Sequence, residues 1–445
     1  MNRSVALSPF RRPSGRPPML LRSHPALRVE DEALAGRAPR ISAGIFCDSP
    51  AVLTILQAAM QDRRLDRVTP QISQGGIRAA IAYYASVPTP DLLIIETTAD
   101  APDILAGLDS LSSVSDPSTK VILIGRCNDI ELYRAIIAKG VSDYLVAPLD
   151  ALRAIAAVLR LYANDAVQRK GRVCAFLGAK GGVGASTLAH NLAWCMGRDR
   201  SGPVMLVDLD LQFGTAALNL DLEPSAGFAE QASDPDRLDQ ALLERTLIQK
   251  GKYLHVLPAS GRMQAIDPPD AAAVEKLLDL SRQAFPLVIL DLPHLYSPWM
   301  KATLAAVDDL VIVAAPDLVN LRNAKCLLEI LRAARPNDPP PRLVLNQIGI
   351  ARRAGLSADE FARGLDVEIK TRIAFDPKAF ATAAGEGKLI AETQPGSAAG
   401  HAIAALARDI DPRQAARRGS QHGKASWLGS LWRAHARADE NDRTT

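Results

Sequence analysis

A glycine-rich segment carries the residues whose types and spacing most clearly indicate chemistry. It reads GAKGGVGAST and follows a short apolar run that is typical of a buried strand. Glycines permit a tight turn whose backbone N–H groups converge on phosphate oxygens, and a helix expected over Ser186–Met196 adds positive potential at its N-terminus. The residues of this predicted phosphate-binding loop are Gly178, Ala179, Lys180, Gly181, Gly182, Val183, Gly184, Ala185, Ser186 and Thr187.

Carboxylates follow two further strand-like runs. The run Val204–Val207 is followed by Asp208 and Asp210, and the run Leu287–Leu290 is followed by Asp291. The carboxyl ends of parallel strands lie over the ligand crevice of an α/β sheet, so we expect these groups beside the bound phosphates. A lone strand-terminal aspartate often only caps the next helix, but three of them together with a phosphate-binding loop are much stronger evidence of a functional site.

Alanine at position 185 departs from the phosphate-loop pattern G-x-x-x-x-G-K-[ST], in which that position is lysine. A methyl group cannot neutralise the β- and γ-phosphates, whereas the loop carries Lys180 early in the turn. The stretch Lys180-Gly-Gly-Val-Gly resembles the deviant Walker A motif of the ParA/MinD ATPases. Its continuation G-A-S-T is similar to the CpaE/TadZ branch, the pilus-assembly relatives of MinD, and the resemblance covers about residues 173–400.

This resemblance implies a nucleotide-dependent homodimer with ATP and Mg²⁺ as cofactors. Lys180 would reach across the dimer to the partner's nucleotide, and Asp210 would polarise the attacking water. The Mg²⁺ would be held by Ser186, Asp208 and Asp291. Because γ-phosphoryl transfer needs positive charge that alanine does not supply, we expect nucleotide binding to be weakened and hydrolysis to be slow or absent.

Two later segments resemble the parts of the same family that contact the base. Leu343-Val-Leu-Asn346-Gln resembles the strand whose asparagine reads the adenine edge. Ile373-Ala-Phe-Asp376 is similar to the segment that flanks the base. A buried strand followed by an Asx turn would give the same pattern without a ligand, so both interpretations stay open.

Positioning these residues requires a sheet that brings them to one edge. Short apolar runs bounded by turn residues are typical of buried parallel strands, and helical patterns lie between them. The strands expected in the first half are Ile41–Phe46, Leu92–Ile95, Val121–Ile124 and Tyr144–Val146. Those expected in the second half are Val173–Leu177, Val204–Val207, Leu287–Leu290, Leu310–Ala314 and Leu343–Leu345. The alternation predicts an α/β protein with two doubly wound parallel-sheet domains.

The first domain resembles a response-regulator receiver of the flavodoxin type. Gly140-Val-Ser-Asp-Tyr-Leu-Val-Ala-Pro148 follows the G-A-x-D-Y-L-x-K-P end of that family. Receiver chemistry needs an aspartate at the end of the third strand and a lysine before the proline, and these positions are Glu96 and Ala147. Only Asp48 remains of the acidic pair. The resemblance implies a protein-interaction or targeting module that is not phosphorylated, and its place before an ATPase domain is the architecture of CpaE.

The 445 residues divide into five expected parts. These are a disordered basic arm (1–40), the receiver-like domain (41–162), a linker (163–172), the MinD/ParA-like ATPase domain (173–410) and a basic tail (411–445).

The net charge of the chain is +3, but it is unevenly distributed. The arm holds eight arginines against three acidic residues and the tail holds seven basic residues against four acidic ones, which leaves about −5 on the body. An acidic body does not favour nucleic-acid binding, so no sequence-specific nucleic acid is expected as a partner. Five scattered cysteines without metal spacing indicate reduced thiols.

The tail contains one short amphipathic segment. Trp427, Leu428, Leu431 and Trp432 share a helix face, and basic residues flank them. Such a segment can rest on an anionic membrane or pack against the body or a partner protein, and both interpretations stay open. Since no run is long enough for a transmembrane helix, a cytoplasmic protein is expected, peripheral at the cytoplasmic face of the inner membrane, with a position at the cell pole left open.

Three functions are consistent with these features. The first is a CpaE-type factor that positions the Flp/Tad pilus secretion components, with ATP as a switch for dimerisation. The second is a MinD/ParA-type division or partition ATPase, which Ala185 disfavours. The third is a scaffold without nucleotide chemistry, which the intact glycines, Ser186, Asp210 and Asp291 disfavour.

Overall fold

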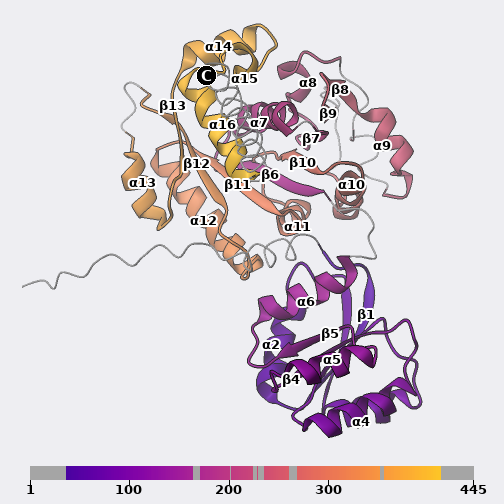
Figure 1. Ribbon diagram of the computed structural model, residues 1–445. Helices are drawn as coiled ribbons and strands as arrows, with labels where there is room; N and C mark the ends of the chain where they lie inside the picture. Colours follow the sequence, from indigo (N-terminus) through magenta and orange to yellow (C-terminus); the bar gives the residue numbers. More distant parts are fainter. Residues whose placement is uncertain are drawn as a thin grey trace, which may run out of the picture.

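The structure, a computed structural model, describes residues 37–163, 171–200, 202–223, 228, 235–259, 268–350 and 355–411 (Figure 1). They form two α/β domains that lie one above the other in Figure 1, each built on its own sheet. Nearly all of the predicted arm, most of the linker and the Trp427–Trp432 segment lie outside these residues. Within them, no helix is both long enough and apolar enough to cross a membrane.

The first domain has five parallel strands in the order β2-β1-β3-β4-β5. The strands are β1 (Ile41–Cys47), β2 (Val68–Gln74), β3 (Leu92–Glu96), β4 (Lys120–Gly125) and β5 (Asp143–Val146). The helices are α2 (Pro50–Met60), α3 (Ile77–Tyr84), α4 (Ala101–Ser112), α5 (Ile130–Ala138) and α6 (Ala151–Ala163). One apolar core lies between the sheet and α2 and α6, and the other lies between the sheet and α3, α4 and α5. This is the strand order of the flavodoxin type.

The second domain has eight strands in the order β13-β12-β11-β6-β10-β7-β9-β8. They are β6 (Arg172–Gly178), β7 (Val204–Asp208), β8 (Ile248–Lys250), β9 (Leu254–Leu257), β10 (Leu287–Asp291), β11 (Asp309–Ala314), β12 (Arg342–Ile348) and β13 (Thr371–Ala374). All pairs are parallel except β8 with β9 at one edge. The predicted class of two doubly wound parallel-sheet domains is confirmed, with this antiparallel edge strand added.

Helices cover both faces of the second sheet. Those on one face are α10 (Ala271–Ala284), α11 (Pro298–Ala306), α12 (Leu318–Ala334) and α13 (Ala358–Leu365). Those on the other are α7 (Ala185–Arg200), α14 (Pro377–Gly385), α15 (Ile390–Thr393) and α16 (Ala398–Ile410). Three short helices, α8 (Ala216–Asn219), η1 (Pro235–Arg237) and α9 (Gln240–Thr246), lie in the segment between β7 and β8.

Strand β2 was not predicted because its sequence lacks the apolar run that marks a buried strand. It reads VTPQISQ, and only Val68 of its residues is buried. The strand lies at the edge of its sheet, paired with β1 alone, so most of its side chains do not need to be apolar. Its place in the sheet comes from the parallel register with β1, which pairs Ile45 with Ile72.

A buried ion cluster joins the two domains. Asp338, just after α12, has a side chain that is 3% exposed and that contacts Arg63 and Arg64 of the first domain. Arg335 completes the cluster from the end of α12. Other ion pairs across this interface join Arg67 to Glu275 and Asp279 of α10, and Arg37 to Glu275. Because Asp338 precedes β12, the first domain docks at the amino edge of the second sheet.

Candidate functional site

The glycine-rich loop joins β6 to α7 at the carboxyl edge of the second sheet. Gly182 and Gly184 have φ angles of +77° and +90°, a region that favours glycine. A Cβ atom added at Gly181 or Gly182 would meet no atom within 4 Å, so the backbone there faces open space. The loop therefore fits an anion held by backbone N–H groups at the start of α7.

Side chains from neighbouring elements bind four carbonyl groups of this loop. Each side chain donates a hydrogen bond from a nitrogen to a carbonyl oxygen of the loop, with nitrogen–oxygen distances of 2.8–2.9 Å. The pairs are His294 Nδ1 with Gly178, Asn323 Nδ2 with Ala179, Gln347 Nε2 with Gly182 and Asn346 Nδ2 with Val183. In a planar trans peptide the N–H points away from the C=O. These hydrogen bonds therefore hold the peptide planes of the loop, and the N–H of each following residue points away from the bonded side chain.

A cavity of about 450 Å³ opens beside the loop, large enough for a nucleotide. The predicted residues Lys180, Gly181, Gly182, Val183, Gly184, Ala185, Ser186, Thr187, Asp210 and Asn346 all line it. One end, beyond β12 and β13, carries Phe375 and Phe380, whose rings suit a base. The opposite end, beyond β10 and β7, carries His294 and Asp210, whose polar groups suit a terminal phosphate and a water.

Asn346 contacts the loop itself. Its amide nitrogen donates a hydrogen bond to the carbonyl oxygen of Val183. A Cβ atom added at Gly184 would lie 2.7 Å from the same nitrogen. Glycine at that position therefore allows the strand and the loop to approach closely. That Asn346 also reads the adenine edge stays a prediction, as does the place of the segment Ile373–Asp376 beside the base. The carboxylate of Asp376 accepts from the Ala379 backbone N–H and caps α14.

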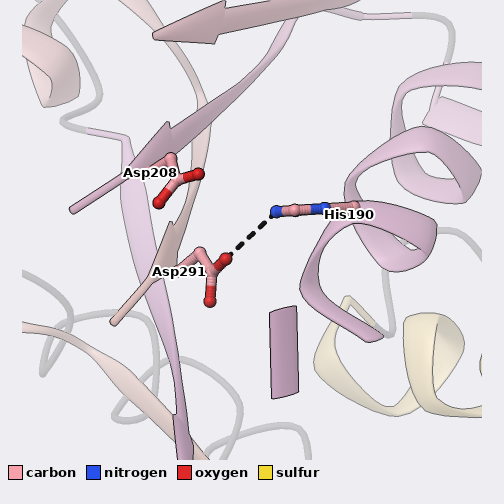
Figure 2. Close-up of side chains that lie close together, drawn as sticks. All are labelled: His190, Asp208 and Asp291. Atoms are coloured by element: carbon pink, nitrogen blue, oxygen red, sulfur yellow. Dashed lines mark hydrogen bonds and ion pairs between the residues drawn. The ribbon is translucent and has the colours of Figure 1, made fainter. Parts of the chain in front are cut away.

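Two predicted carboxylates lie beside a histidine behind the loop (Figure 2). Asp208 and Asp291 are paired residues at the ends of β7 and β10, and His190 points toward them from α7. All three are buried, and one possible ligand atom from each lies within 4.8 Å of the others. His190 Nε2 is 3.0 Å from Asp291 Oδ2. The fold thus brings an imidazole to two carboxylates that are far from it in sequence.

Burial and charge alter the protonation of this cluster. Burial, followed by the charge of Asp291, raises the pKa of Asp208 well above the ordinary range of an aspartate. Burial lowers the pKa of His190, but the hydrogen bond and charge of Asp291 outweigh it, and the pKa is raised overall. Both shifts favour a proton held within the cluster, which reduces the repulsion between its carboxylates.

The two carboxylates differ in how well they fit a Mg²⁺ ion. Asp208 accepts from the backbone N–H groups of Asp210 and Ala216 at 3.1 and 3.0 Å, so both of its oxygens already hold the loop after β7. Asp291 Oδ1 is buried and has no hydrogen-bond partner among the described residues. Such an oxygen fits a cation or a cation-bound water, and the Ser186 hydroxyl lines the neighbouring cavity. The hydrogen bonds of Asp208 therefore position the loop after β7. A role for Asp208 in the Mg²⁺ shell stays a prediction.

Asp210 stands where a water could be polarised. Burial, with a smaller contribution from the charge of Asp291, raises its pKa, although the backbone N–H of Phe213 opposes the shift. A carboxylate with a raised pKa is a stronger base, which suits the predicted role. That Lys180 acts across a dimer stays a prediction.

Sequence reasoning did not predict several of these side chains, among them His190, His294, Asn323 and Gln347. His190 lies four residues after Ser186, so on α7 the two share a face, and this spacing was the available signal. His294 follows Asp291 by three residues and could have been tested as a loop residue at the carboxyl edge. Gln347 has a φ of +58°, which the sequence gives no means of anticipating.

The acidic site of the first domain is arranged differently from a phosphate acceptor. The Glu96 side chain is buried, and its carboxylate accepts from the backbone N and the Oγ of Ser49 at 2.8 and 2.5 Å. Asp48 accepts from the backbone N of Thr98 at 3.0 Å. Both Glu96 oxygens are therefore engaged, and Ala147 places a methyl group where a receiver has its lysine.

Comparisons with known proteins match this architecture. A family model described as an AAA domain matches residues 171–337. The chromosome-partitioning ATPase Soj of Thermus thermophilus is 30% identical over 258 residues, which cover 56% of this chain and 98% of Soj.

Two solved structures are also similar. The pilus assembly protein CpaE from Caulobacter crescentus is 43% identical over 28% of this chain and 97% of its own, with a TM-score of 0.28. A ParA family ATPase from Chlorobium tepidum is 26% identical over 54% of this chain and 98% of its own, with a TM-score of 0.48.

Proposed function

The chain belongs to the ParA/MinD-type P-loop ATPases, and we propose that within this family it is a nucleotide-dependent dimeric localisation factor of the CpaE kind. It binds Mg-ATP, dimerises, and positions Flp/Tad pilus secretion components at the cytoplasmic face of the inner membrane. The observation that carries the nucleotide part is the glycine-rich loop, which lines the cavity and whose carbonyl groups are held by side-chain hydrogen bonds.

Exposed apolar side chains around the cavity support dimerisation. Large apolar residues that the described part of the ATPase domain leaves exposed all follow the carboxyl ends of strands. They are Phe213, Leu218, Leu295, Tyr296, Leu318, Val319 and Phe375. Monomeric proteins rarely expose such patches, so a second copy of the chain is their proposed cover. Leu218 has the highest exposed fraction of these residues, at 75%.

The position of the first domain is compatible with this dimer. It docks through Asp338 at the amino edge of the second sheet, whereas the cavity and the apolar side chains lie at the carboxyl edge. Dimerisation through the carboxyl edge would therefore leave both receiver-like domains free for partners. Since Glu96 is held by Ser49, partner binding through this domain does not require phosphorylation.

Slow hydrolysis fits a localisation factor. In this proposal, bound ATP supplies a terminal phosphate that favours the dimer over the monomer. Ala185 offers that phosphate no charge, so we expect the ATP-bound dimer to persist. A long-lived dimer suits a protein that marks a position.

The pilus role itself depends on the sequence resemblance to CpaE. A receiver-like domain without its phosphate acceptor and lysine precedes an ATPase domain without its second loop lysine. Division and partition ATPases of the MinD/ParA type keep that lysine. A partition role is the second candidate, because the chromosome-partitioning ATPase Soj matches this chain over 258 residues, which are 98% of its own length. That alternative predicts robust turnover and DNA affinity that falls steeply with salt.

Sedimentation of the full chain tests the proposal. Mg-ATP should convert the wild type to a dimer, and Leu218→Arg should prevent this because it places charges in the proposed interface. Leu152→Arg, at an exposed leucine of α6, is the matched control and should dimerise normally. Co-purification of Flp/Tad secretion components with the wild type, but not with Leu218→Arg, tests the localisation role. A wild type that stays monomeric in Mg-ATP contradicts the proposal.

A further inference from the structure

His294 stands at the end of the cavity where a terminal phosphate would lie. It follows β10, and it lines the cavity together with Asp210 and the glycine-rich loop. The aromatic rings of Phe375 and Phe380 line the opposite end, beyond β13. The strands run in the order β13-β12-β11-β6-β10, with the loop after β6. A nucleotide whose base lies beside β13 and whose phosphates lie in the loop therefore extends its last phosphate toward β10.

The imidazole of His294 is oriented by the loop itself. Nδ1 lies 2.9 Å from the carbonyl oxygen of Gly178, the first residue of the loop. A carbonyl oxygen can only accept, so Nδ1 carries a hydrogen and donates it. Nε2 then remains for another contact, and among the described residues it has no hydrogen-bond partner. When the ring is protonated, Nε2 becomes a second, positively charged donor.

The cavity has few groups that can carry positive charge. Among the lining residues that the structure describes, only Lys180 and His294 can do so. The family resemblance directs Lys180 toward the partner's nucleotide, and Ala185 contributes only a methyl group. Besides Lys180, His294 is therefore the described lining residue able to offer a cation to the phosphates bound in its own subunit.

We propose that His294 recognises the terminal phosphate of a bound nucleoside triphosphate through Nε2, and so supplies in this chain the contact that a lysine at position 185 would make. This inference rests on the proposed nucleotide binding and adds a residue that distinguishes ATP from ADP. The bond from Nδ1 to Gly178 positions the ring, and the protonated ring donates from Nε2 to a phosphate oxygen. Loss of that contact weakens ATP binding and leaves ADP binding largely intact, because ADP lacks the phosphate concerned.

A pair of variants separates phosphate recognition from support of the loop. His294→Asn keeps an amide N–H near the position of Nδ1 and removes the group at Nε2, whereas His294→Gln can place an amide N–H near Nε2. Calorimetry on the full chain would give the dissociation constants of Mg-ATP and Mg-ADP for each. We expect His294→Asn to weaken Mg-ATP about ten- to a hundredfold, the loss typical of a charged hydrogen bond, and Mg-ADP less than about twofold. His294→Gln should retain more of the preference for ATP.

The control is His401→Asn, at an exposed histidine of α16, which should bind both nucleotides as the wild type does. If His294→Asn keeps the wild-type ratio of ATP to ADP affinity, the inference is wrong, whether both affinities fall together or neither changes. That result leaves the proposed function intact. If the wild type binds neither nucleotide, the proposed nucleotide binding is itself wrong and this inference falls with it.

Discussion

His190 Nε2 lies 3.0 Å from Asp291 Oδ2, inside the ATPase domain where neither side chain has appreciable exposure (Figure 2). His190 comes one turn after Ser186 on α7, so the helix that begins at the phosphate loop also supplies a partner for the carboxylate of β10. The amide of Asn219 closes the other side of the ring, 3.1 Å from Nδ1. This arrangement keeps one oxygen of Asp291 fixed and leaves the other, Oδ1, for a cation.

Replacing His190 by alanine should destabilise the domain. The change leaves Asp291 and Asp208 buried together without the imidazole that lies beside them. Breaking a buried pair in this way lowers the free energy of unfolding by about 3–5 kcal/mol. Urea unfolding of the full chain measures the change in the free energy of unfolding. His401→Ala, at an exposed histidine, should change it by less than about 0.5 kcal/mol. Equal stability of His190→Ala and the wild type would show that the contact with Asp291 contributes nothing.

Ala185→Lys should strengthen nucleotide binding. The new ammonium group would enter the cavity that Ala185 lines and bond the phosphates. A charge-assisted hydrogen bond of about 1.5 kcal/mol corresponds to roughly tenfold tighter Mg-ATP binding, with faster hydrolysis. Ala185→Met is the control, since its chain is of similar length and carries no charge. Calorimetry and phosphate release measure both effects, and a lysine variant that binds no better than the methionine variant would refute the charge argument.

The elements that could be predicted are those whose own residues carry the signal. Strands β6, β7 and β10 each contain an unbroken apolar run because both of their faces are covered, so these strands and the phosphate loop follow from the sequence. Edge strand β2 is mostly not buried and has no such signal. The missed parts of the site depend on long-range contacts. His190 meets a carboxylate 101 residues away, and Gln347 reaches a carbonyl 165 residues away.

The first domain should not accept phosphate. Both oxygens of Glu96 accept hydrogen bonds from Ser49, and the lysine that assists a receiver is replaced by Ala147. Incubation with acetyl phosphate and Mg²⁺ should leave the mass of the intact chain unchanged, with an active receiver as the positive control. A phosphate adduct mapped to the peptide that contains Glu96 would contradict this account.

The ion cluster between the domains should respond to acid. Burial alone would raise the pKa of Asp338, but the guanidinium groups of Arg63, Arg335 and Arg64 outweigh burial and hold the pKa below its ordinary value. A carboxylate with a lowered folded-state pKa stabilises the fold above its unfolded pKa of about 3.9, and this contribution is lost as the pH falls through the folded value. Asp338→Asn should therefore be destabilising by about 3 kcal/mol at neutral pH, and the difference from wild type should shrink below about pH 4.

The control for that experiment is Asp359→Asn. Asp359 pairs with Arg372 on the surface, with a side chain that is 70% exposed, so its loss should cost less than about 1 kcal/mol. Unfolding in urea at neutral and acid pH gives both comparisons. A constant difference between Asp338→Asn and wild type across this range would mean that the cluster is not held by the ionised carboxylate.

Mg-ATP binding by calorimetry, with sedimentation run alongside, tests the central claim of a nucleotide switch most directly. We predict that the wild type binds Mg-ATP with micromolar affinity and dimerises, and that Lys180→Ala fails to dimerise. Lys370→Ala, at an exposed lysine, should behave as the wild type does. Absence of Mg-ATP binding by the wild type, or dimerisation that is independent of nucleotide, would contradict the switch and favour a scaffold that keeps the fold without its chemistry.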